Sequence, residues 1–578
     1  MNTVKNLLRY IRRYRLMLLL ALLCAVISVG FSLYIPVLVG EAIDYMLGKG
    51  MVDFGEVGRV VLIMLILITL IAVFRWFMDF LSSVVSARVV RDLRNDLFRK
   101  TNTLPLRDID SRAHGDLISR ITNDVEAVGD GMTQVITKLF SGIVTIVGTL
   151  IFMLMINVWI ALVVVVLTPL SVLVAAVIGK MCAKSFREQQ RLQGEISSYV
   201  EEIIGNQKVV KSFSYEERSQ AEFEKQNKKL FKAGLRAQFA GALANPSTRF
   251  VNNMVYAATG IAGALTVVSA FMGTLTIGGL SCFLTYANQY TKPFNEVTGV
   301  LTQIQTALAA GERIFNTLSA ESEPDESDKM KLDNVRGELE FKNVRFSYSA
   351  DKELIKNFSL KVKSGQQVAI VGPTGCGKTT LINLIMRFYE TLDGEILLDG
   401  ISTKGINRDN LRQKFGMVLQ DSWLFSGTIM DNLRYGNPNA SDEEIIAAAK
   451  MSYAHSFIRK MPDGYNTKLN ENAENLSAGQ KQLLCIARAM ALDPPVLILD
   501  EATSSIDTLT EIRVQKAFKK LMKGRTSFIV AHRLSTIKES DIILVMNDGD
   551  IIEQGTHDEL LKSKGFYYNL YNSQFIDS

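Results

Sequence analysis

"QVAIVGPTGCGKTTLINLI", residues 367–385, predicts a short buried strand, a glycine-rich loop and a helix, in that order. Gly372 and Gly377 enclose four residues, and Lys378 and Thr379 follow. Glycines let backbone N–H groups turn inward around phosphate oxygens, the lysine adds a charge for the β- and γ-phosphates, and the threonine hydroxyl can ligate Mg²⁺. The stretch therefore predicts a nucleoside triphosphate site in an α/β domain.

Two later apolar runs end in residues that suit the same chemistry. "PVLILDEATSS" (495–505) reaches Asp500 and Glu501, and "TSFIVAHRLST" (526–536) reaches His532. Acids and histidines at strand ends are often structural, but parallel α/β sheets bind ligands at the carboxyl edge. We expect Asp500 to hold Mg²⁺ through water, Glu501 to polarise the attacking water or take its proton, and His532 to contact the γ-phosphate.

A second loop-to-helix start lies at "NLSAGQKQ", residues 475–482. Ser477 can cap the helix that follows, and free N–H groups at a helix start attract phosphate oxygens. The sequence thus indicates two phosphate-binding elements in one chain.

The first half of the chain is dominated by long apolar runs. Each approaches or exceeds the roughly 20 residues that a helix needs to cross the hydrocarbon layer. This length disfavours the alternative of a buried bundle in a soluble protein. The basic segment "RYIRRYR" resembles the flank of a signal peptide, but the run after it is long and more runs follow, so we expect a retained span. The runs lie near 16–40, 60–83, 135–156, 158–181, 250–273 and 277–300.

Lysine and arginine are distributed unevenly between the runs. They gather before the first run, between the second and third, and between the fourth and fifth, whereas the opposite connections carry few, such as Lys49 and Arg59. Positively charged loops remain in the cytoplasm. We therefore expect a multi-pass protein of the cell membrane with both termini, both long loops and the nucleotide-binding domain in the cytoplasm.

The composition excludes several other classes of protein. Hydrophobic residues make up 48% and charged residues 21%, and the net charge is only +5, which does not suggest nucleic-acid binding. The five cysteines are scattered and there are only four histidines, which argues against a zinc site, a disulfide framework and a multi-histidine metal centre.

A polar, acidic stretch without apolar periodicity lies around residues 318–335. Short β-rich runs then alternate with helical patterns, as in an α/β domain. We expect a transmembrane domain with six helices and two long intracellular loops at 1–320, a linker at 321–335 and a nucleotide-binding domain at 336–578.

Together, in this order, the motifs resemble those of a half-transporter of the ATP-binding cassette (ABC) exporters of the bacterial multidrug type, over essentially the whole chain. The resemblance implies a six-helix, all-α transmembrane domain like that of type I exporters, followed by an α/β P-loop domain that binds ATP and Mg²⁺. It assigns catalysis to Glu501, His532 and Gln420, Mg²⁺ to Thr379, Gln420 and Asp500, and adenine stacking to Tyr348. It assigns the rest of the ATP site to Gly372, Pro373, Thr374, Gly375, Cys376, Gly377, Lys378, Thr379 and Thr380.

The resemblance also explains the second phosphate-binding element. In this family two cassettes dimerise head to tail, so the signature of one chain (here Ser477, Ala478, Gly479 and Gln480) faces the ATP of the other. Asp507 matches the loop that passes the dimer interface, and Glu471 matches a loop that touches the intracellular helices. Residues 110–126 and 212–220 resemble the two short coupling helices that rest on the cassettes.

The signature departs from the usual pattern of the family. Ala478 replaces its first glycine, Asn470 and Ala473 replace glycines upstream, and Leu483 stands where arginine often follows. An alanine adds a methyl group near the phosphate and restricts φ. Because many bacterial heterodimeric exporters have one weakened site, these departures favour a heterodimer over a homodimer.

The resemblance implies ATP-driven export of hydrophobic or amphiphilic compounds by alternating access, coupled to cassette dimerisation and ATP hydrolysis. The alternatives are a lipid flippase or peptide exporter of the same family, an ATP-gated channel, and a membrane-anchored ATPase. Glu501 argues against a channel that needs slow hydrolysis. Within the second run, Arg75 and Asp79 indicate an internal ion pair rather than a substrate contact.

Overall fold

The computed structural model describes residues 2–46, 52–269, 275–348, 354–419, 422–470, 473–500, 507–530 and 534–575. The chain divides into two compact units. Unit 1 comprises Met1–Leu104 and Arg112–Ser322, and unit 2 comprises Pro105–Ser111 and Glu323–Ser578. A short segment from the first half of the sequence therefore packs with the second half.

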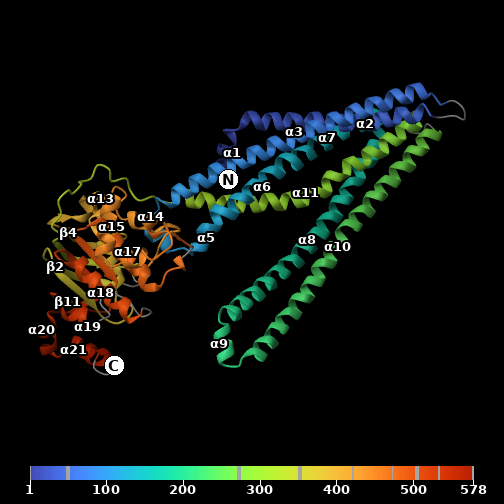
Figure 1. Cartoon of the computed structure of the whole chain (residues 1–578). Helices are drawn as coiled ribbons and strands as arrows, with labels where there is room; N and C mark the ends of the chain where they lie inside the picture. The colour runs from blue at the N-terminus through green and yellow to red at the C-terminus, as the bar shows by residue number, and fades with distance from the viewer. Residues whose placement is uncertain are drawn as a thin grey trace. The chain divides into compact units, whose positions relative to one another are not determined.

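The described part of unit 1 is helical throughout (Figure 1). α2 lies beside α3, and α8 and α10 form an antiparallel hairpin that α9 closes. The six apolar runs fall on α2, α3, η2 with α7, α8, α10 and α11, which confirms the expected all-α architecture. The elements are α1 (Asn2–Arg12), α2 (Arg15–Asp44), α3 (Phe54–Thr101), α5 (His114–Ser119), η1 (Arg120–Asp124), α6 (Val125–Gln134), η2 (Val135–Phe140), α7 (Ser141–Ile156), α8 (Val158–Gly205), α9 (Gln207–Ser212), α10 (Glu216–Ser269) and α11 (Ile277–Leu318).

Within the described residues, four helical stretches are long and apolar enough to cross a membrane, judged by length and composition. They are Arg15–Asp44, Phe54–Thr101, Gly115–Ile156 and Glu216–Val268. In α8 the sequence runs from Val158 to Gly179 without a charged residue. α11 is not among the four, because "TYANQYTKPFNE" interrupts its apolar sequence with polar residues. The polar residues of α11 weaken its own hydropathy signal, although it packs against other helices of the unit.

Glycines let α11 approach two other helices closely. A Cβ on Gly278 would lie 2.0 Å from the carbonyl oxygen of Gly40 in α2, and a Cβ on Gly131 in α6 would lie 2.3 Å from the Cβ of Ala307. Small residues at such crossings replace side-chain packing with direct backbone contact. The N–H of Gly278 also donates to Asp44 Oδ1 at 2.8 Å, which ties the start of α11 to the end of α2.

Aspartates on α3 and η1 hold the other ends of these helices together. Tyr10 donates to Asp96 at 2.8 Å and Tyr14 donates to Asp92 at 2.7 Å, which fastens α1 and the start of α2 to α3. Arg313 Nε on α11 donates to the buried Asp124 at 2.8 Å. Because a buried carboxylate is costly unless it is paired, these contacts fix the relative positions of the helices.

The expected ion pair within α3 is wrong. Arg75 and Asp79 are both described and exposed, and the structure shows no ion pair between them. Two exposed charges therefore lie within an otherwise apolar span, on the surface of α3.

The short helices of the two long loops lie upstream of the expected coupling segments. α4 (Leu106–Asp110) packs in unit 2, whereas most of 110–126 belongs to the start of the long helical stretch that leads to α7. In the second loop the short helix is α9, and the expected segment 212–220 contains the turn that follows it and the start of α10. The charged, polar sequence therefore predicted where the chain bends, but not the positions of the short helices next to those bends.

Unit 2 contains two main sheets. A six-stranded sheet has the order β12-β11-β3-β10-β9-β6, and a four-stranded antiparallel sheet has the order β2-β1-β4-β5. β3, β6, β9, β10 and β11 are parallel, and β12 is the antiparallel edge strand. The strands are β1 (Leu339–Phe346), β2 (Ile355–Val362), β3 (Gln367–Val371), β4 (Asp393–Leu398), β5 (Ile401–Ser402), β6 (Phe415–Val418), β7 (Gly427–Thr428), β8 (Lys468–Leu469), β9 (Val496–Asp500), β10 (Thr526–Val530), β11 (Ile542–Asn547) and β12 (Asp550–Gly555).

The six-stranded sheet separates two hydrophobic cores. Along β3, Val368 and Ile370 pack into the core shared with the antiparallel sheet, and Ala369 and Val371 pack into the core on the other side. This alternation is the period of a strand that is buried on both faces. The helices are α4 (Leu106–Asp110), α12 (Lys378–Ile385), η3 (Thr403–Gly405), α13 (Arg408–Gln413), α14 (Ile429–Arg434), α15 (Asp442–Met451), α16 (His455–Ile458), η4 (Gly464–Asn466), α17 (Ala478–Leu492), α18 (Thr508–Met522), α19 (Leu534–Lys538), α20 (His557–Ser563) and α21 (Phe566–Phe575).

Candidate functional site

The loop between β3 and α12 has a backbone that favours glycine at three points. Gly372, Gly375 and Gly377 have φ values of +156°, +84° and +103°. A Cβ on Gly372 would lie 2.2 Å from the carbonyl oxygen of Met546. α12 begins at Lys378, so the N–H groups of its first turn adjoin the loop. Such an arrangement suits a phosphate group.

The lysine of this loop lies over its backbone. Lys378 Nζ donates to two loop carbonyl oxygens, those of Gly372 and Pro373, at 2.8 and 2.9 Å. Thr379 is exposed beside it, whereas Cys376 and Thr380 are only 3% and 5% exposed. The predicted loop residues thus divide into accessible groups and buried groups that pack beneath them. The other accessible residues are Pro373, Thr374 and Gly375.

Four parallel strands bring the other predicted groups to one edge of the sheet. β3 pairs with β10, β10 with β9, and β9 with β6. The register places Val530 opposite both Ile370 and Asp500, so Asp500 ends at the same edge as the phosphate loop. The expected catalytic residues follow the ends of β6, β9 and β10 in the sequence. These residues, Gln420, Glu501 and His532, lie outside the described residues, as does Glu471.

Tyr348 lies close to the phosphate-loop helix. Its hydroxyl accepts a hydrogen bond from Asn383 Nδ2 of α12 at 3.1 Å, and its ring makes edge contacts with Phe346 and Tyr389, each with centroids 4.9 Å apart. The side chain still leaves the residue 45% exposed. A fixed, half-exposed ring of this kind is suited to stacking on a base.

Residues 475–482, the second element expected to bind phosphate, have the helix start that the sequence predicts. α17 begins at Ala478 with Ser477 as its N-cap. The Ser477 hydroxyl accepts the N–H of Gln480 at 3.3 Å, and Gln480 Oε1 accepts the N–H of Ser477 at 3.0 Å. This capping box leaves Ser477 and Ala478 exposed and Gly479 buried.

The structure distinguishes the two alanines that stand where the family pattern has glycine. Ala478 is the first helical residue and does not have a positive φ, so the conformational freedom of glycine is not required there. Ala473 has a φ of +50° and is fully buried. A left-handed backbone is strained for alanine but not for glycine. The backbone cost of the departures therefore falls on Ala473, and at Ala478 only the methyl group remains as a difference.

Asp507, expected at a dimer interface, is the N-cap of α18. Its carboxylate accepts the N–H of Thr510 at 3.0 Å. Hydrogen bonding from Thr510 lowers the pKa of Asp507, so the cap is charged at neutral pH.

Sequence reasoning missed Arg488, which looks like an ordinary solvated charge within the α17 pattern. Its guanidinium donates to the backbone oxygen of Asn432 at 3.0 Å and to that of Trp423 at 3.3 Å, and it lies over the rings of Phe425 and Tyr435. Burial lowers the pKa of Arg488. Arg488 therefore fastens α17 to the segment that follows β6.

Comparison with known families matches both units. Residues 18–294 match the ABC transporter transmembrane region, and residues 355–504 match the ABC transporter domain. The second match begins at β2 and ends after β9, so it contains the phosphate loop, the signature and Asp500.

Individual relatives match over nearly the whole chain. A fatty acid ABC transporter ATP-binding/permease protein of Mycobacterium tuberculosis is 39% identical over 525 residues, which is 90% of this chain and 82% of that protein. A putative multidrug export ATP-binding/permease protein, YgaD of Bacillus subtilis, is 34% identical over 584 residues and the whole of both chains. A solved bacterial Atm1-family ABC exporter with ATP bound has a TM-score of 0.76 at 29% identity, and the match covers 98% of each chain.

Proposed function

Because this chain belongs to the ABC transporter family, with the fold of an ATP-hydrolysing exporter, we propose that it exports hydrophobic or amphiphilic compounds of the multidrug type across the cell membrane. One observation carries the proposal. The phosphate loop and Asp500 end at one edge of a parallel sheet, in a chain whose other unit has helices of membrane-spanning length.

In this proposal ATP lies along the loop after β3. Lys378 and the loop N–H groups bind its phosphates, and Tyr348 stacks on the adenine. Thr379 is exposed and Asp500 is partly buried, and the oxygen atoms of both side chains fit a hard cation. We therefore assign Mg²⁺ to Thr379 and Gln420 directly and to Asp500 through water. Bound Mg²⁺ would neutralise charge on the phosphates. Glu501 accepts a proton from the attacking water, and His532 contacts the γ-phosphate.

ABC exporters of this kind function as dimers, and two features of the chain support a partner. The exposed, capped start of α17 is a phosphate-binding end that the proposed ATP site of the same chain does not use. Arg75 and Asp79 are exposed within the apolar span of α3, where lipid contact would be costly. We propose that α17 completes the ATP site of a second half-transporter and that this face of α3 borders a cavity or the partner.

We propose a different half-transporter as that partner, with a second copy as the alternative. The chain retains Lys378, Asp500 and Glu501 of its own site, and its departures gather in the signature that it lends to the partner. The exposed methyl group of Ala478 is the feature that would hinder phosphate approach.

Replacing Ala478 with glycine tests this assignment. In the dimers that the chain forms with itself when it is expressed alone, Ala478→Gly should raise ATPase by about two- to tenfold, because about 0.5–1.4 kcal/mol of obstruction corresponds to that range. The control is Ala473→Gly, which relieves a strained backbone but adds no access to the helix start. An unchanged ATPase rate in Ala478→Gly would show that the methyl group is harmless and would remove the main argument for a heterodimer.

The proposed orientation places both termini and unit 2 in the cytoplasm, following the positive charge of the loops. ATP binding would close the cassette pair and switch the membrane cavity from inward- to outward-facing. Hydrolysis would release the pair. In this proposal the catalysis of ATP hydrolysis depends mostly on positioning and on electrostatic stabilisation.

The function is tested in proteoliposomes that report ATP hydrolysis and solute movement together. We expect an amphiphilic dye to stimulate ATPase and to move in one direction, and Glu501→Gln to abolish both signals. The relatives named for fatty acid and multidrug transport make a lipid substrate the second candidate, so a fluorescent lipid is assayed in parallel. ATPase activity without movement of any solute would contradict export.

A further inference from the structure

The segment after α11 is built into unit 2 by its backbone. Met330 pairs with Ile406 in an isolated parallel bridge, and the N–H of Asn407 donates to the carbonyl of Met330 at 2.8 Å. The N–H of Leu332 donates to Asn410 Oδ1 at 2.7 Å. The chain enters unit 2 at Glu323, so only a short segment lies between the start of this unit and these hydrogen bonds.

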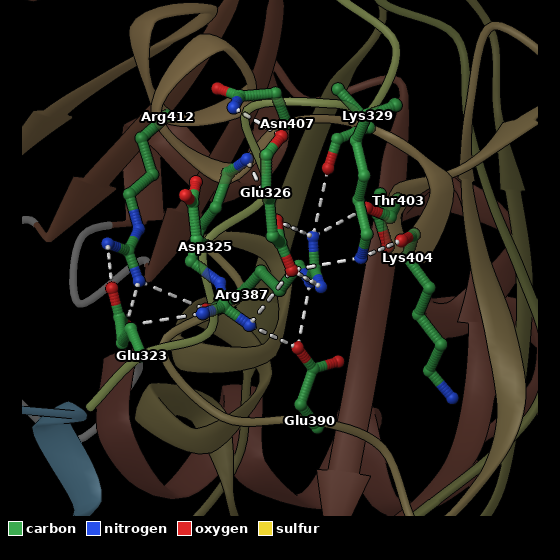
Figure 2. A network of polar contacts seen from close by, with 12 residues as sticks. Glu323, Asp325, Glu326, Lys329, Arg387, Glu390, Thr403, Lys404, Asn407 and Arg412 are labelled. Atoms are coloured by element: carbon green, nitrogen blue, oxygen red, sulfur yellow. Dashed lines mark hydrogen bonds and ion pairs between the residues drawn. The ribbon is translucent and has the colours of Figure 1, made fainter. Parts of the chain in front are cut away.

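Glu326 is the centre of a buried ionic network in this segment (Figure 2). Its side chain is 4% exposed and that of Arg387 is 5% exposed. Arg387 Nη2 and Nη1 donate to Oε1 and Oε2 of Glu326 at 2.7 and 3.1 Å, and Lys329 Nζ donates to Oε1 at 2.9 Å. Burial opposes ionisation, but the hydrogen bonds from Lys329 and Arg387 outweigh it and lower the pKa of Glu326. The pair is thus a charged, bidentate contact of the strong kind.

The other donors of Arg387 are also used. Nε donates to Glu390 Oε1 at 2.9 Å, and Nη1 donates to the carbonyl oxygens of Thr403 and Ile406 at 3.0 and 3.1 Å. Only the planar fork of arginine can make this set of bonds. Arg387 therefore joins the linker, the end of α12 and the loop before α13.

A second ion pair reaches the same place. Arg412 donates to Glu323 at 2.9 and 3.2 Å and to the carbonyl oxygen of Arg387 at 3.2 Å, and its guanidinium lies 5.1 Å from the ring centroid of Phe388. Two acidic residues of the linker are thereby fastened to residues 387–390, which we call the attachment turn.

The attachment turn also holds the segment that comes from the first long loop. Tyr389 donates to Asp110 Oδ2 at 2.7 Å, and Leu106 of α4 packs against the core that contains Tyr389. Burial and the Asp110 carboxylate raise the pKa of Tyr389, so the phenol remains a donor. Both stretches of chain that pass between the units, 105–111 and 323–332, thus meet residues 387–390 inside unit 2.

We propose that Glu326 and Arg387 are positioning residues that couple ATP turnover to transport, by fixing the linker to the attachment turn. The proposal rests on the export function proposed above. α12 begins at Lys378 in the phosphate loop and ends at Ile385, two residues before Arg387. A helix of this length is a short rod of about 12 Å, which carries a displacement at the loop to the turn. If the linker is not bound to the attachment turn, part of that displacement is not transmitted to the linker.

Glu326→Gln tests the proposal, because it keeps the size of the side chain and removes its charge. We expect transport per ATP hydrolysed to fall about fivefold while the ATPase rate stays within about twofold, as for other residues along a coupling path. The matched control is Glu553→Gln. Glu553 accepts the N–H groups of Phe566 and Tyr567 at 2.6 and 2.9 Å and fastens α21 to the same unit. The control should lower the Tm without changing transport per ATP.

Tyr389→Phe gives a second, independent variant, since it removes the Asp110 bond and keeps the ring. If both segments act through one turn, the double variant Glu326→Gln/Tyr389→Phe should lose no more coupling than the worse single variant. Losses that multiply, to about 25-fold if each single variant loses about fivefold, would indicate independent attachments and overturn the proposal. Unchanged coupling in Glu326→Gln, or equal loss in Glu553→Gln, would also overturn it. Unsubstituted protein that hydrolyses ATP and moves no solute instead refutes the export function, and this proposal with it.

Discussion

Glu501→Gln is expected to reduce steady-state ATP hydrolysis by about 10²- to 10⁴-fold, the range typical for loss of a general base. The amide keeps the shape of the side chain but cannot accept a proton from the attacking water. ATP binding should persist, because the proposed phosphate contacts come from Lys378 and the loop backbone, which the change does not touch. ATP should therefore accumulate in closed dimers.

Two measurements on the purified protein check this prediction. Phosphate release gives the rate, and size-exclusion chromatography with nucleotide analysis gives the trapped dimer and its ATP content. Glu443→Gln, an exposed acidic residue in the first turn of α15, serves as the control and should behave as the unsubstituted chain. Hydrolysis that continues at the normal rate in Glu501→Gln would remove this residue from its assigned role.

Lys378→Ala should abolish most ATP binding and reduce hydrolysis by about 10²- to 10³-fold, comparable with the loss of one charge-stabilising donor. In the structure Lys378 Nζ holds two carbonyl oxygens of the loop, at 2.8 and 2.9 Å. The variant thus loses both a charge for the phosphates and a contact that fixes the loop. Lys378→Arg keeps the charge but is not equivalent, since a planar fork does not replace a point charge.

Binding of a fluorescent ATP analogue separates the two effects. Lys378→Ala should bind the analogue at least about tenfold more weakly, a difference of about 1.4 kcal/mol. In the absence of nucleotide, its Tm should change no more than the Tm of Lys363→Ala, which replaces an exposed lysine before β3. Equal affinity in Lys378→Ala and the unsubstituted chain would contradict the assigned ATP site.

Much of the fold follows from local sequence. The glycines at 372, 375 and 377 are needed because the loop adopts positive φ values there, and the capping box at Ser477 and Gln480 sets the start of α17. These features involve residues only a few positions apart, so their spacing predicts the geometry. The lengths of the apolar runs are likewise set by one physical dimension, the thickness of the hydrocarbon layer.

The stretch at 321–335 shows where local reasoning stops. Its acidic, aperiodic sequence suggests a solvated linker, yet from Glu323 onward it packs in unit 2, and the side chain of Glu326 is 4% exposed. The same limit explains why Arg75 and Asp79 suggested a pair that the structure lacks. Helical spacing brings two charges within reach, but it does not decide whether they turn toward each other.

The sequence alone therefore determined the nucleotide chemistry, the membrane half and the family, because each depends on short motifs, run lengths or their order. Only the tertiary structure decided how the linker and α4 are held. Glu326 and Arg387 are 61 positions apart, and Asp110 and Tyr389 are 279 positions apart. A charged residue in a polar stretch looks the same in the sequence whether its side chain is solvated or paired with a residue far away in the chain. Folding brings these partners together, and burial then makes their pairing obligatory.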